Sequence, residues 1–441
     1  MRTNKSMRVL NNAKWIIVCK IIQSLLQFVV GMLCARYLGP SNYGLINYAA
    51  SVVAFVIPIM RLGFDSTLVH ELVENPEKEG EILGTSLTLN ILSSFVCIGI
   101  TTVFVSFANA GERETVLVCF LYSLSVFFAA VEMIQYWFQY KLKSKYSSIS
   151  MLIAYVVVAA YRIFLLVSQK SVYWFSVTHS IEYCIVAILL VLIYFKKGGA
   201  RFCFSAEMAK KIFSRSKHYI IASLMLVVLQ NTDHIMLTSI SGTEETGFYS
   251  AAITCATVVQ FVYIAVIDSF RPVILANKKE KSDEYETNVS GLYGFTSYLA
   301  LAQSIVFTVA AKLIVWILYG EEFMQAVPVL QILTWYFLFS VMGVVRNVWI
   351  LAEQKQKYLW IINLSGALFN VILNAFLIPE FGASGAAFAS LMTQFFANFV
   401  LGFIIKPLRE NNRLILQGIN PVFVIKEAKN ILSLFLKKHV K

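Results

Sequence analysis

Apolar runs of about twenty residues recur along the whole chain, and they limit its fold more than any other feature. Of the 441 residues, 58% are hydrophobic and only 14% are charged, whereas a soluble domain usually carries about 25% charged residues. A helix needs about 20 apolar residues to cross the hydrocarbon core of a bilayer. The pattern excludes a soluble globular fold and predicts an all-α membrane protein.

The apolar runs predict twelve transmembrane helices. The first run is too long for the apolar core of a signal peptide, so we interpret it as a membrane helix. The predicted spans are residues 15–38, 44–64, 82–107, 116–138, 149–168, 172–195, 218–240, 248–270, 291–319, 327–352, 358–378 and 383–405.

The distribution of basic residues gives the predicted orientation. Of the 37 Lys and Arg residues, 29 fall in the termini and in the loops that share their side, and three fall in the opposite loops. Cytoplasmic loops are enriched in Lys and Arg, so both termini are expected in the cytoplasm. The net charge of +12 therefore reports topology, and we expect no nucleic-acid partner. An acidic loop after the second span is an exception to this pattern.

The chain divides into two predicted lobes of six spans, at residues 1–195 and 218–406. Between them lies a basic amphipathic linker, 196–217, expected at the cytoplasmic membrane surface, and residues 407–441 form an amphipathic cytoplasmic tail. The segment "LGPSNYGLINYAA" is echoed by "SGTEETGFYSAA" after the first span of the second lobe. The echo suggests two parallel repeats with a substrate path between them, although two tight turns would also explain it.

The sequence contains no convincing enzymatic constellation. There is no G-x-x-x-x-G-K-[ST] motif for nucleotide phosphates, and the seven cysteines show no metal or disulfide spacing. The five histidines are dispersed, and the spacing of His179 and Glu182 is more typical of helix packing than of a metal site. We expect no catalytic residues, no metal and no cofactor.

Cations inside the predicted spans are the candidate substrate-binding residues. A charge at mid-bilayer costs about 2.5 to 3.5 kcal/mol, so it normally faces a protein interior or a wet cavity. Lys20 shares a helix face with Gln23 and Gln27, which makes a polar stripe on the first span. Arg162 is the next candidate, whereas Arg61, Lys312 and Arg346 lie near span ends, where long side chains also reach the membrane surface.

Acidic residues inside the spans are candidates for coupling to an ion. Asp233 lies in the polar segment "QNTDH" of the seventh span, and Glu182 lies on the sixth. Either residue would carry a proton or a sodium ion, or it would neutralise a neighbouring cation, as would Glu132. The sequence leaves both the ion and these alternatives open.

Four segments together resemble one protein family. They are "ARYLGPSNYG" (Ala35–Gly44), "TDHIMLTSISGTEETGFYSAA" (Thr232–Ala252), "LYGEEFMQAVPVLQIL" (Leu318–Leu333) and "NVILNAFLIPEFGASGAAFAS" (Asn370–Ser390). In this order they resemble the Wzx-type polysaccharide flippases of the multidrug/oligosaccharidyl-lipid/polysaccharide exporter superfamily, which translocate O-antigen and capsule repeat units.

The resemblance implies a V-shaped pair of six-helix lobes that carries lipid-linked oligosaccharide from the inner to the outer leaflet. It also implies a cavity lined by cations, which transfers to Lys20 and less firmly to Arg61, Arg162 and Arg346. The acidic loop after the second span departs from the basic loop expected in the family.

We therefore expect a flippase of the bacterial cytoplasmic membrane that works by alternating access on a polyprenyl-diphosphate-linked glycan. Its partners would be membrane lipids and the polysaccharide polymerase and chain-length machinery. Two rivals stay open, namely a drug or metabolite antiporter of the same superfamily and an integral-membrane polysaccharide polymerase or ligase. The intramembrane cations argue against the first, and the short outer loops argue against the second.

Overall fold

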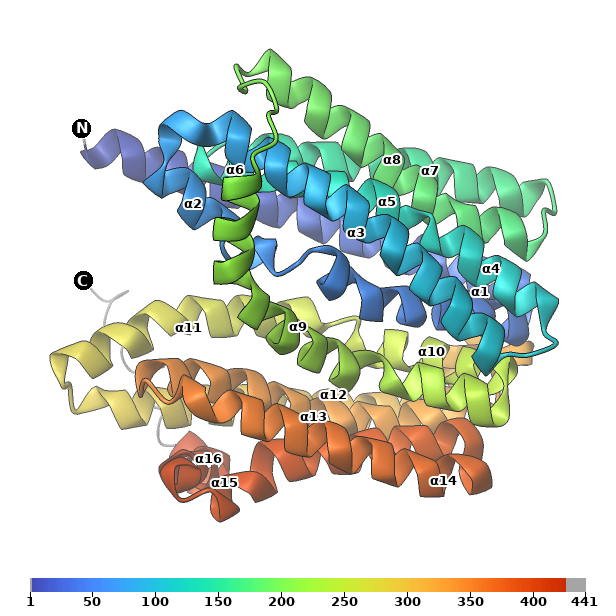
Figure 1. Ribbon diagram of the computed structural model, residues 1–441. Helices are drawn as coiled ribbons and strands as arrows, with labels where there is room; N and C mark the ends of the chain where they lie inside the picture. Colours follow the sequence, from blue (N-terminus) through green and yellow to red (C-terminus); the bar gives the residue numbers. More distant parts are fainter. Residues whose placement is uncertain (1, 426–441) are drawn as a thin grey trace, which may run out of the picture. The chain divides into compact units, whose positions relative to one another are not determined.

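The computed structural model describes residues 2–425, and every regular element in that range is helical (Figure 1). The chain divides into two compact units, Met1–Gly247 and Phe248–Lys441. The boundary between the units therefore lies after the end of α9. The sequence predicts the boundary earlier, at residues 196–217. The predicted limits of the lobes stay a prediction. The helices of the first unit are α1 (Arg2–Met60), α2 (Leu68–Glu74), α3 (Glu79–Ala108), α4 (Arg113–Ser123), α5 (Ser125–Ala129), α6 (Gln135–Tyr140), α7 (Ser144–Val167), α8 (Val172–Lys196) and α9 (Ala206–Ser241).

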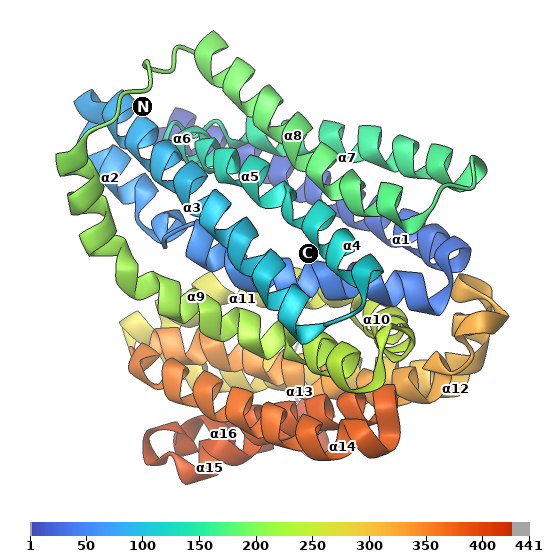
Figure 2. The ribbon, with the colours of Figure 1, turned by 45° about the vertical axis from the view of Figure 1, so that its right-hand side comes forward.

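Helix α10 (Thr243–Thr257) begins in the first unit and ends in the second. The remaining helices are α11 (Gln260–Glu280), α12 (Glu284–Tyr319), α13 (Ala326–Ala352), α14 (Leu359–Phe395), α15 (Leu401–Ile404) and α16 (Arg409–Ile419). In the first unit α1 packs against α7, α9, α4 and α3, and α7 packs against α8. In the second unit α12, α13 and α14 pack in sequence, and α16 lies against α12 (Figure 2).

Within the described residues, nine helices are long and apolar enough to cross a membrane, or ten if the bent pair α10 and α11 forms one span. Two of the nine are too long for one crossing. The runs Val18–Met60 and Gln356–Ile404 contain 43 and 49 residues, or about 65 and 75 Å at 1.5 Å per residue. The hydrocarbon core is only about 30 Å thick.

Each long run contains a glycine with non-helical backbone angles. Gly39 has φ 72° and ψ 171°, and Gly382 has φ 52° and ψ −131°. Both glycines lie in or beside the breaks expected between predicted spans. A multi-pass, all-α membrane protein is thus confirmed, whereas the count of twelve and the orientation of the termini stay predictions.

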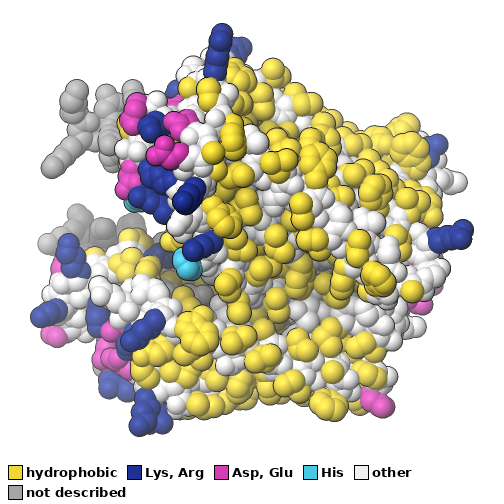
Figure 3. Space-filling model, viewed as in Figure 1, with side chains coloured by type: hydrophobic (Ala, Val, Ile, Leu, Met, Phe, Trp, Pro, Cys, Tyr) yellow, Lys and Arg dark blue, Asp and Glu magenta, His cyan; other side chains and the backbone are white. Residues whose placement is uncertain are grey.

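The surface of the described residues supports the membrane assignment. Large apolar side chains are exposed on the long helices. Examples are Phe107 on α3, Val309 on α12 and Phe376 on α14, which are 82%, 83% and 72% exposed. Figure 3 shows hydrophobic side chains over the middle of the helices in each unit, with charged side chains gathered towards helix ends. Exposed apolar area on this scale is stable only against lipid or another apolar partner.

The basic segment expected as a surface linker packs against the first unit instead of standing apart. It begins α9 and continues into the membrane helix without a break. Met208 and Ile212 are buried in a hydrophobic core with Trp137 and Tyr194, whereas Phe213 remains exposed. Ser205 caps the helix by accepting a hydrogen bond from the Met208 amide at 3.3 Å.

The acidic loop after the second predicted span holds this segment in place. Glu71, only 1% exposed, forms ion pairs with Lys211 at 3.2 Å and with Arg215. Arg215 also pairs with Glu74 at 2.8 Å, and this hydrogen bond lowers the pKa of the Glu74 carboxyl. The acidic residues are therefore counterions for the start of α9, which explains why this loop is not basic.

The beginning of the predicted tail is part of the second unit. Helix α16 buries Leu414 and Ile415, and Gly418 lies against the backbone of Ser290 and Gly294 on α12. The surface helix predicted from Asn420 onwards falls mostly in residues 426–441, outside the described residues.

The two echoed glycine motifs contact each other within the first unit. Gly39 and Gly242 share a left-handed φ followed by an extended ψ, at 72°, 171° and 92°, 176° respectively, a conformation that favours glycine. Ser41 and Thr243 are joined by a 2.9 Å hydrogen bond. A Cβ atom at Gly44 would lie 2.6 Å from the Gly247 nitrogen and would overlap the Thr243 carbonyl.

Replacing Gly44 by valine should destabilise the protein by about 1–3 kcal/mol, because the new side chain would enter backbone atoms of the partner motif. Thermal unfolding of the purified protein in detergent measures the change. Gly99→Ala is the control, because a Cβ at Gly99 meets nothing within 4 Å. Equal melting temperatures for Gly44→Val and wild type would show that the motifs do not pack closely.

Candidate functional site

The polar stripe predicted on the first span lies at the surface of the first unit. Lys20 and Gln27 are exposed and Gln23 is half-buried, and none has a hydrogen-bond or ion-pair partner among the described residues. Apolar side chains beside the stripe, such as Val18 and Leu25, are also exposed. The polar groups of the stripe are therefore not occupied by contacts within the first unit. A surface that binds substrate needs polar groups that are free in this way.

Arg61, in contrast, is already paired. It follows the last residue of α1, and its Nη2 atom donates to Glu132 Oε2 at 2.8 Å. Glu132 lies in a 3-10 turn, Ala130–Ile134, that interrupts the fourth predicted span. The sequence predicts only that Glu132 would neutralise a cation, and the structure identifies that cation as Arg61.

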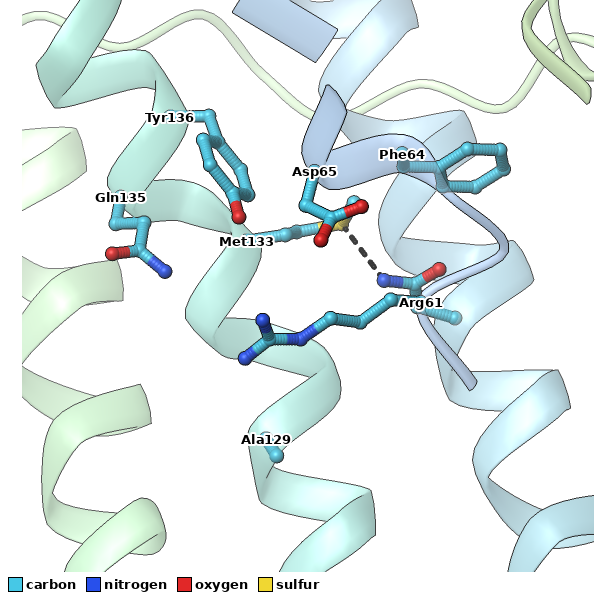
Figure 4. A pocket seen from close by; sticks show the side chains of 8 residues that line it. Arg61, Phe64, Asp65, Ala129, Met133, Gln135 and Tyr136 are labelled. Atoms are coloured by element: carbon cyan, nitrogen blue, oxygen red, sulfur yellow. Dashed lines mark hydrogen bonds between the residues drawn. The ribbon is translucent and has the colours of Figure 1, made fainter. Parts of the chain in front are cut away.

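The Arg61 side chain borders a small pocket with room for about one water molecule. Figure 4 shows Asp65 and Tyr136 on one side of it and the Arg61 side chain crossing beside Met133. The pocket is lined by Arg61, Phe64, Asp65, Asn90, Ala129, Met133, Gln135 and Tyr136. Sequence reasoning missed Asp65 and Asn90, and the only available signal was the Arg61 to Asp65 spacing of four residues at a span end.

Arg162 and Glu182 belong to a second polar group of the first unit. Arg162 on α7 donates from Nε to Thr178 Oγ1 on α8 at 3.1 Å. Glu182, one turn further along α8, interacts electrostatically with Arg162 and also with Glu132. His179 stacks on Tyr122 with ring centroids 4.6 Å apart. The predicted substrate residue Arg162 and the predicted coupling residue Glu182 are thus neighbours.

Asp233, the other predicted coupling residue, is buried on α9 and interacts electrostatically with His234. Its polar neighbours Asn231 and Thr232 bond back to helix carbonyls, Val227 at 3.2 Å and Val228 at 2.6 Å. This explains how "QNTDH" is tolerated in an apolar helix. The ion-coupling role of Asp233 stays a prediction.

Arg346 occupies a buried position in the second unit. It is 5% exposed, and its Nη1 atom donates to the carbonyl oxygen of Ala397 at 2.6 Å. Ala397 belongs to a π-helical turn, Phe396–Val400, a feature that frees backbone groups from the regular helical ladder. Within the described residues Arg346 has no carboxylate partner, and its Nε atom makes no hydrogen bond. In this conformation the buried Arg346 side chain cannot contact substrate. Its assignment as a substrate-binding residue stays a prediction.

Most of the cysteines are buried, as small hydrophobic side chains are. All seven lie within the described residues and carry free thiols, and five of them are buried. In residues 2–425 no group of three or more His, Cys, Asp or Glu side chains is arranged to hold a metal ion.

The fold defines the class of protein, which is a multi-pass helical membrane protein. It is similar to a solved structure of lipid II flippase MurJ in an inward closed conformation, with TM-score 0.71 and 14% identity over 97% of this chain and 99% of the other. It is also similar to an inward-facing multidrug resistance MATE family transporter of the MOP superfamily, with TM-score 0.69, 13% identity, and 88% and 94% coverage.

The family follows from the sequence. Residues 9–278 match the family described as "Polysaccharide biosynthesis protein", and the chain belongs to this family. A relative from Staphylococcus aureus, "Capsular polysaccharide biosynthesis protein CapF", is 22% identical over 403 residues, which cover 88% of this chain and 97% of the relative. The resemblance to polysaccharide flippases of the exporter superfamily is confirmed.

Replacing Arg346 by methionine should leave the melting temperature unchanged or raise it, because a buried guanidinium without a carboxylate is costly to desolvate. The same variant should lose transport if the cation meets substrate in another conformation. Melting in detergent and export in cells measure the two effects. Arg409→Met is the control, because Arg409 also donates to a carbonyl, that of Phe403 at 2.9 Å, but is exposed. A lower melting temperature with unchanged export would make Arg346 purely structural.

Proposed function

We propose that the protein is a flippase that moves polyprenyl-diphosphate-linked oligosaccharide repeat units from the inner to the outer leaflet of the bacterial cytoplasmic membrane. The observation that carries this proposal is the match to the polysaccharide biosynthesis family over residues 9–278. The name of the relative CapF, which refers to capsular polysaccharide, supports a role in surface polysaccharide assembly. The MurJ and MATE structures have comparable TM-scores, so the fold alone does not choose between a flippase and a drug antiporter.

The physical barrier explains why such a protein is needed. A glycan exposes many hydroxyls, and each costs about 4–8 kcal/mol to bury in hydrocarbon without a partner. A hydrophilic path through the protein removes most of that cost. The diphosphate of the carrier is anionic, so its outward movement across an inside-negative membrane is favourable by about 2.3 kcal/mol per charge per 100 mV. The potential therefore drives export without nucleotide hydrolysis by this chain.

Twelve crossings are the topology that fits this function. Dividing the run Val18–Met60 at Gly39 and the run Gln356–Ile404 at Gly382 gives each half a length close to one bilayer. With α10 and α11 as one bent span, the total is twelve. An even number would place both termini on the same side of the membrane, and the distribution of Lys and Arg predicts that this side is the cytoplasm. The lobes would then alternate between inward-open and outward-open arrangements.

Lys20 is the strongest candidate for the diphosphate contact. Its ammonium group is exposed and has no counterion among the described residues, in contrast to Arg61, which pairs with Glu132. Gln23 and Gln27 continue the same face and would donate hydrogen bonds to sugar hydroxyls. Lipid-linked glycan is the substrate, and the polymerase and chain-length machinery would take up the product. Arg162 and Arg346 would contribute in conformations that open their surroundings.

Replacing Lys20 by alanine should lower glycan export about tenfold or more, because a charge-assisted contact is worth about 1.5–3 kcal/mol. Surface polysaccharide at matched protein level is the measurement. Lys312→Ala is the control, since Lys312 is also an exposed intramembrane lysine, on α12. Normal export by Lys20→Ala would remove this residue from the substrate path.

A further inference from the structure

A groove opens between the ends of α3 and α4 in the first unit. The two helices lie side by side, and the segment 109–112 connects them (Figure 2). The groove has a volume of about 310 Å³, which is within the range of pockets that hold small ligands. None of the predicted substrate-binding or ion-coupling residues lines it. The groove is therefore a different feature from the candidate site described above.

The inner part of the groove runs along two membrane helices. On α3 its lining extends from Asn109 back to Thr102, which is about 10 Å at 1.5 Å per residue. On α4 it is lined by Leu117 and Phe120, which are 44% and 37% exposed. The Thr102 hydroxyl donates to the Ile98 carbonyl oxygen at 2.9 Å, so it needs no partner from the groove. Open space beside exposed apolar side chains of membrane helices suits a lipid chain.

The mouth of the groove is polar, and hydrogen bonds hold it in place. Tyr48 on α1 donates to Asn109 Oδ1 at 2.8 Å, and Asn109 Nδ2 donates to Glu112 Oε2 at 3.2 Å. The Thr115 hydroxyl donates to the same Glu112 oxygen at 2.9 Å. Both bonds to the carboxylate reach Oε2, and no residue in the range 2–425 donates to Oε1. The carboxylate is therefore fixed in position with one oxygen available to a ligand.

Arg113 is the cation at the mouth of the groove. It is exposed, and it forms no ion pair within 4.0 Å with a carboxylate of the described residues. Glu112 and Glu114, which flank it in the sequence, are exposed as well. A headgroup with only negative charge would meet two carboxylates for one guanidinium. A headgroup that carries both a phosphate and an ammonium group matches this arrangement of charges.

We propose that the groove binds a zwitterionic aminophospholipid of the phosphatidylethanolamine class. Arg113 contacts the phosphate, and the primary ammonium group donates a hydrogen bond to Glu112 Oε1. One acyl chain lies along Leu117 and Phe120. The connection from α3 to α4 follows the third predicted span, so the predicted orientation assigns this lipid to the outer leaflet. The lipid site does not rest on the proposed function.

Native mass spectrometry of the full-length protein tests the site directly. The protein is released from nanodiscs that contain equal amounts of phosphatidylethanolamine, phosphatidylcholine and phosphatidylglycerol, with acyl chains of different mass. The wild type should retain phosphatidylethanolamine about tenfold over the other two lipids, because only its headgroup makes both charge-assisted contacts. The quaternary ammonium of phosphatidylcholine has no N–H to donate to Glu112, and phosphatidylglycerol has no cation.

Two variants test the headgroup contacts. Arg113→Gln and Glu112→Gln should each lower the retention of phosphatidylethanolamine to the level of the other lipids. Lys170→Gln is the matched control and should keep it, because Lys170 is an exposed cation on the same predicted side and does not line the groove. Glu112 also holds Asn109 and Thr115. Arg113→Gln, at an exposed position without an ion pair among the described residues, therefore decides the test if Glu112→Gln does not fold.

A third variant tests the acyl-chain contact without a change of charge. In Leu117→Trp the indole should fill part of the groove and lower the retention of phosphatidylethanolamine several-fold. Val103→Trp is its control, because Val103 is 56% exposed on α3 but does not line the groove. Equal retention of the three lipids by the wild type would overturn the proposal, as would retention that is unchanged in Arg113→Gln or Leu117→Trp. Preferential retention of phosphatidylglycerol would overturn it too, because an anionic lipid would then occupy the groove.

Discussion

The structure depends on one constraint, which is that charges inside a bilayer must be compensated by the protein. Hydrocarbon offers no hydrogen bonds, so an intramembrane ion faces a partner, a wet cavity or another conformation. In the first unit Arg61 forms an ion pair with Glu132, and Arg162 interacts electrostatically with Glu182. Lys20 has no such partner among the described residues. This contrast separates cations that interact with an acidic side chain of the unit from one that has no such partner among the described residues, and it is the reason why Lys20 is proposed as the contact with an anionic substrate.

Charge compensation also fixes the start of α9 in the first unit. The acidic side chains Glu71 and Glu74 neutralise Lys211 and Arg215 and so fix the start of α9. The other end of α9 leads into the glycine motif that packs against the end of the first span. Between these anchors, residues 217–231 include no buried side chain among those described. Helix α9 is therefore held at its two ends, whereas no described side chain in its middle is buried.

The sequence predicts the fold class well because hydropathy and the placement of Lys and Arg are local signals. The breaks at Gly39 and Gly382 were also visible, since each lies between two apolar runs. Contacts between distant residues were not visible. Arg61 and Glu132 are 71 positions apart, and nothing in the spacing of either residue specifies the other. Asp65 escaped notice because it follows a span and was counted as part of a loop, and the burial of Arg346 depends on the π-helical turn at Ala397.

The most direct test of the account is the leaflet distribution of lipid-linked glycan in cells depleted of the protein. If the protein is the flippase, the repeat unit should accumulate in the inner leaflet and disappear from the outer one, and renewed expression should reverse this. An unchanged outer-leaflet pool after depletion, with surface polysaccharide lost, would place the protein after translocation and contradict the account.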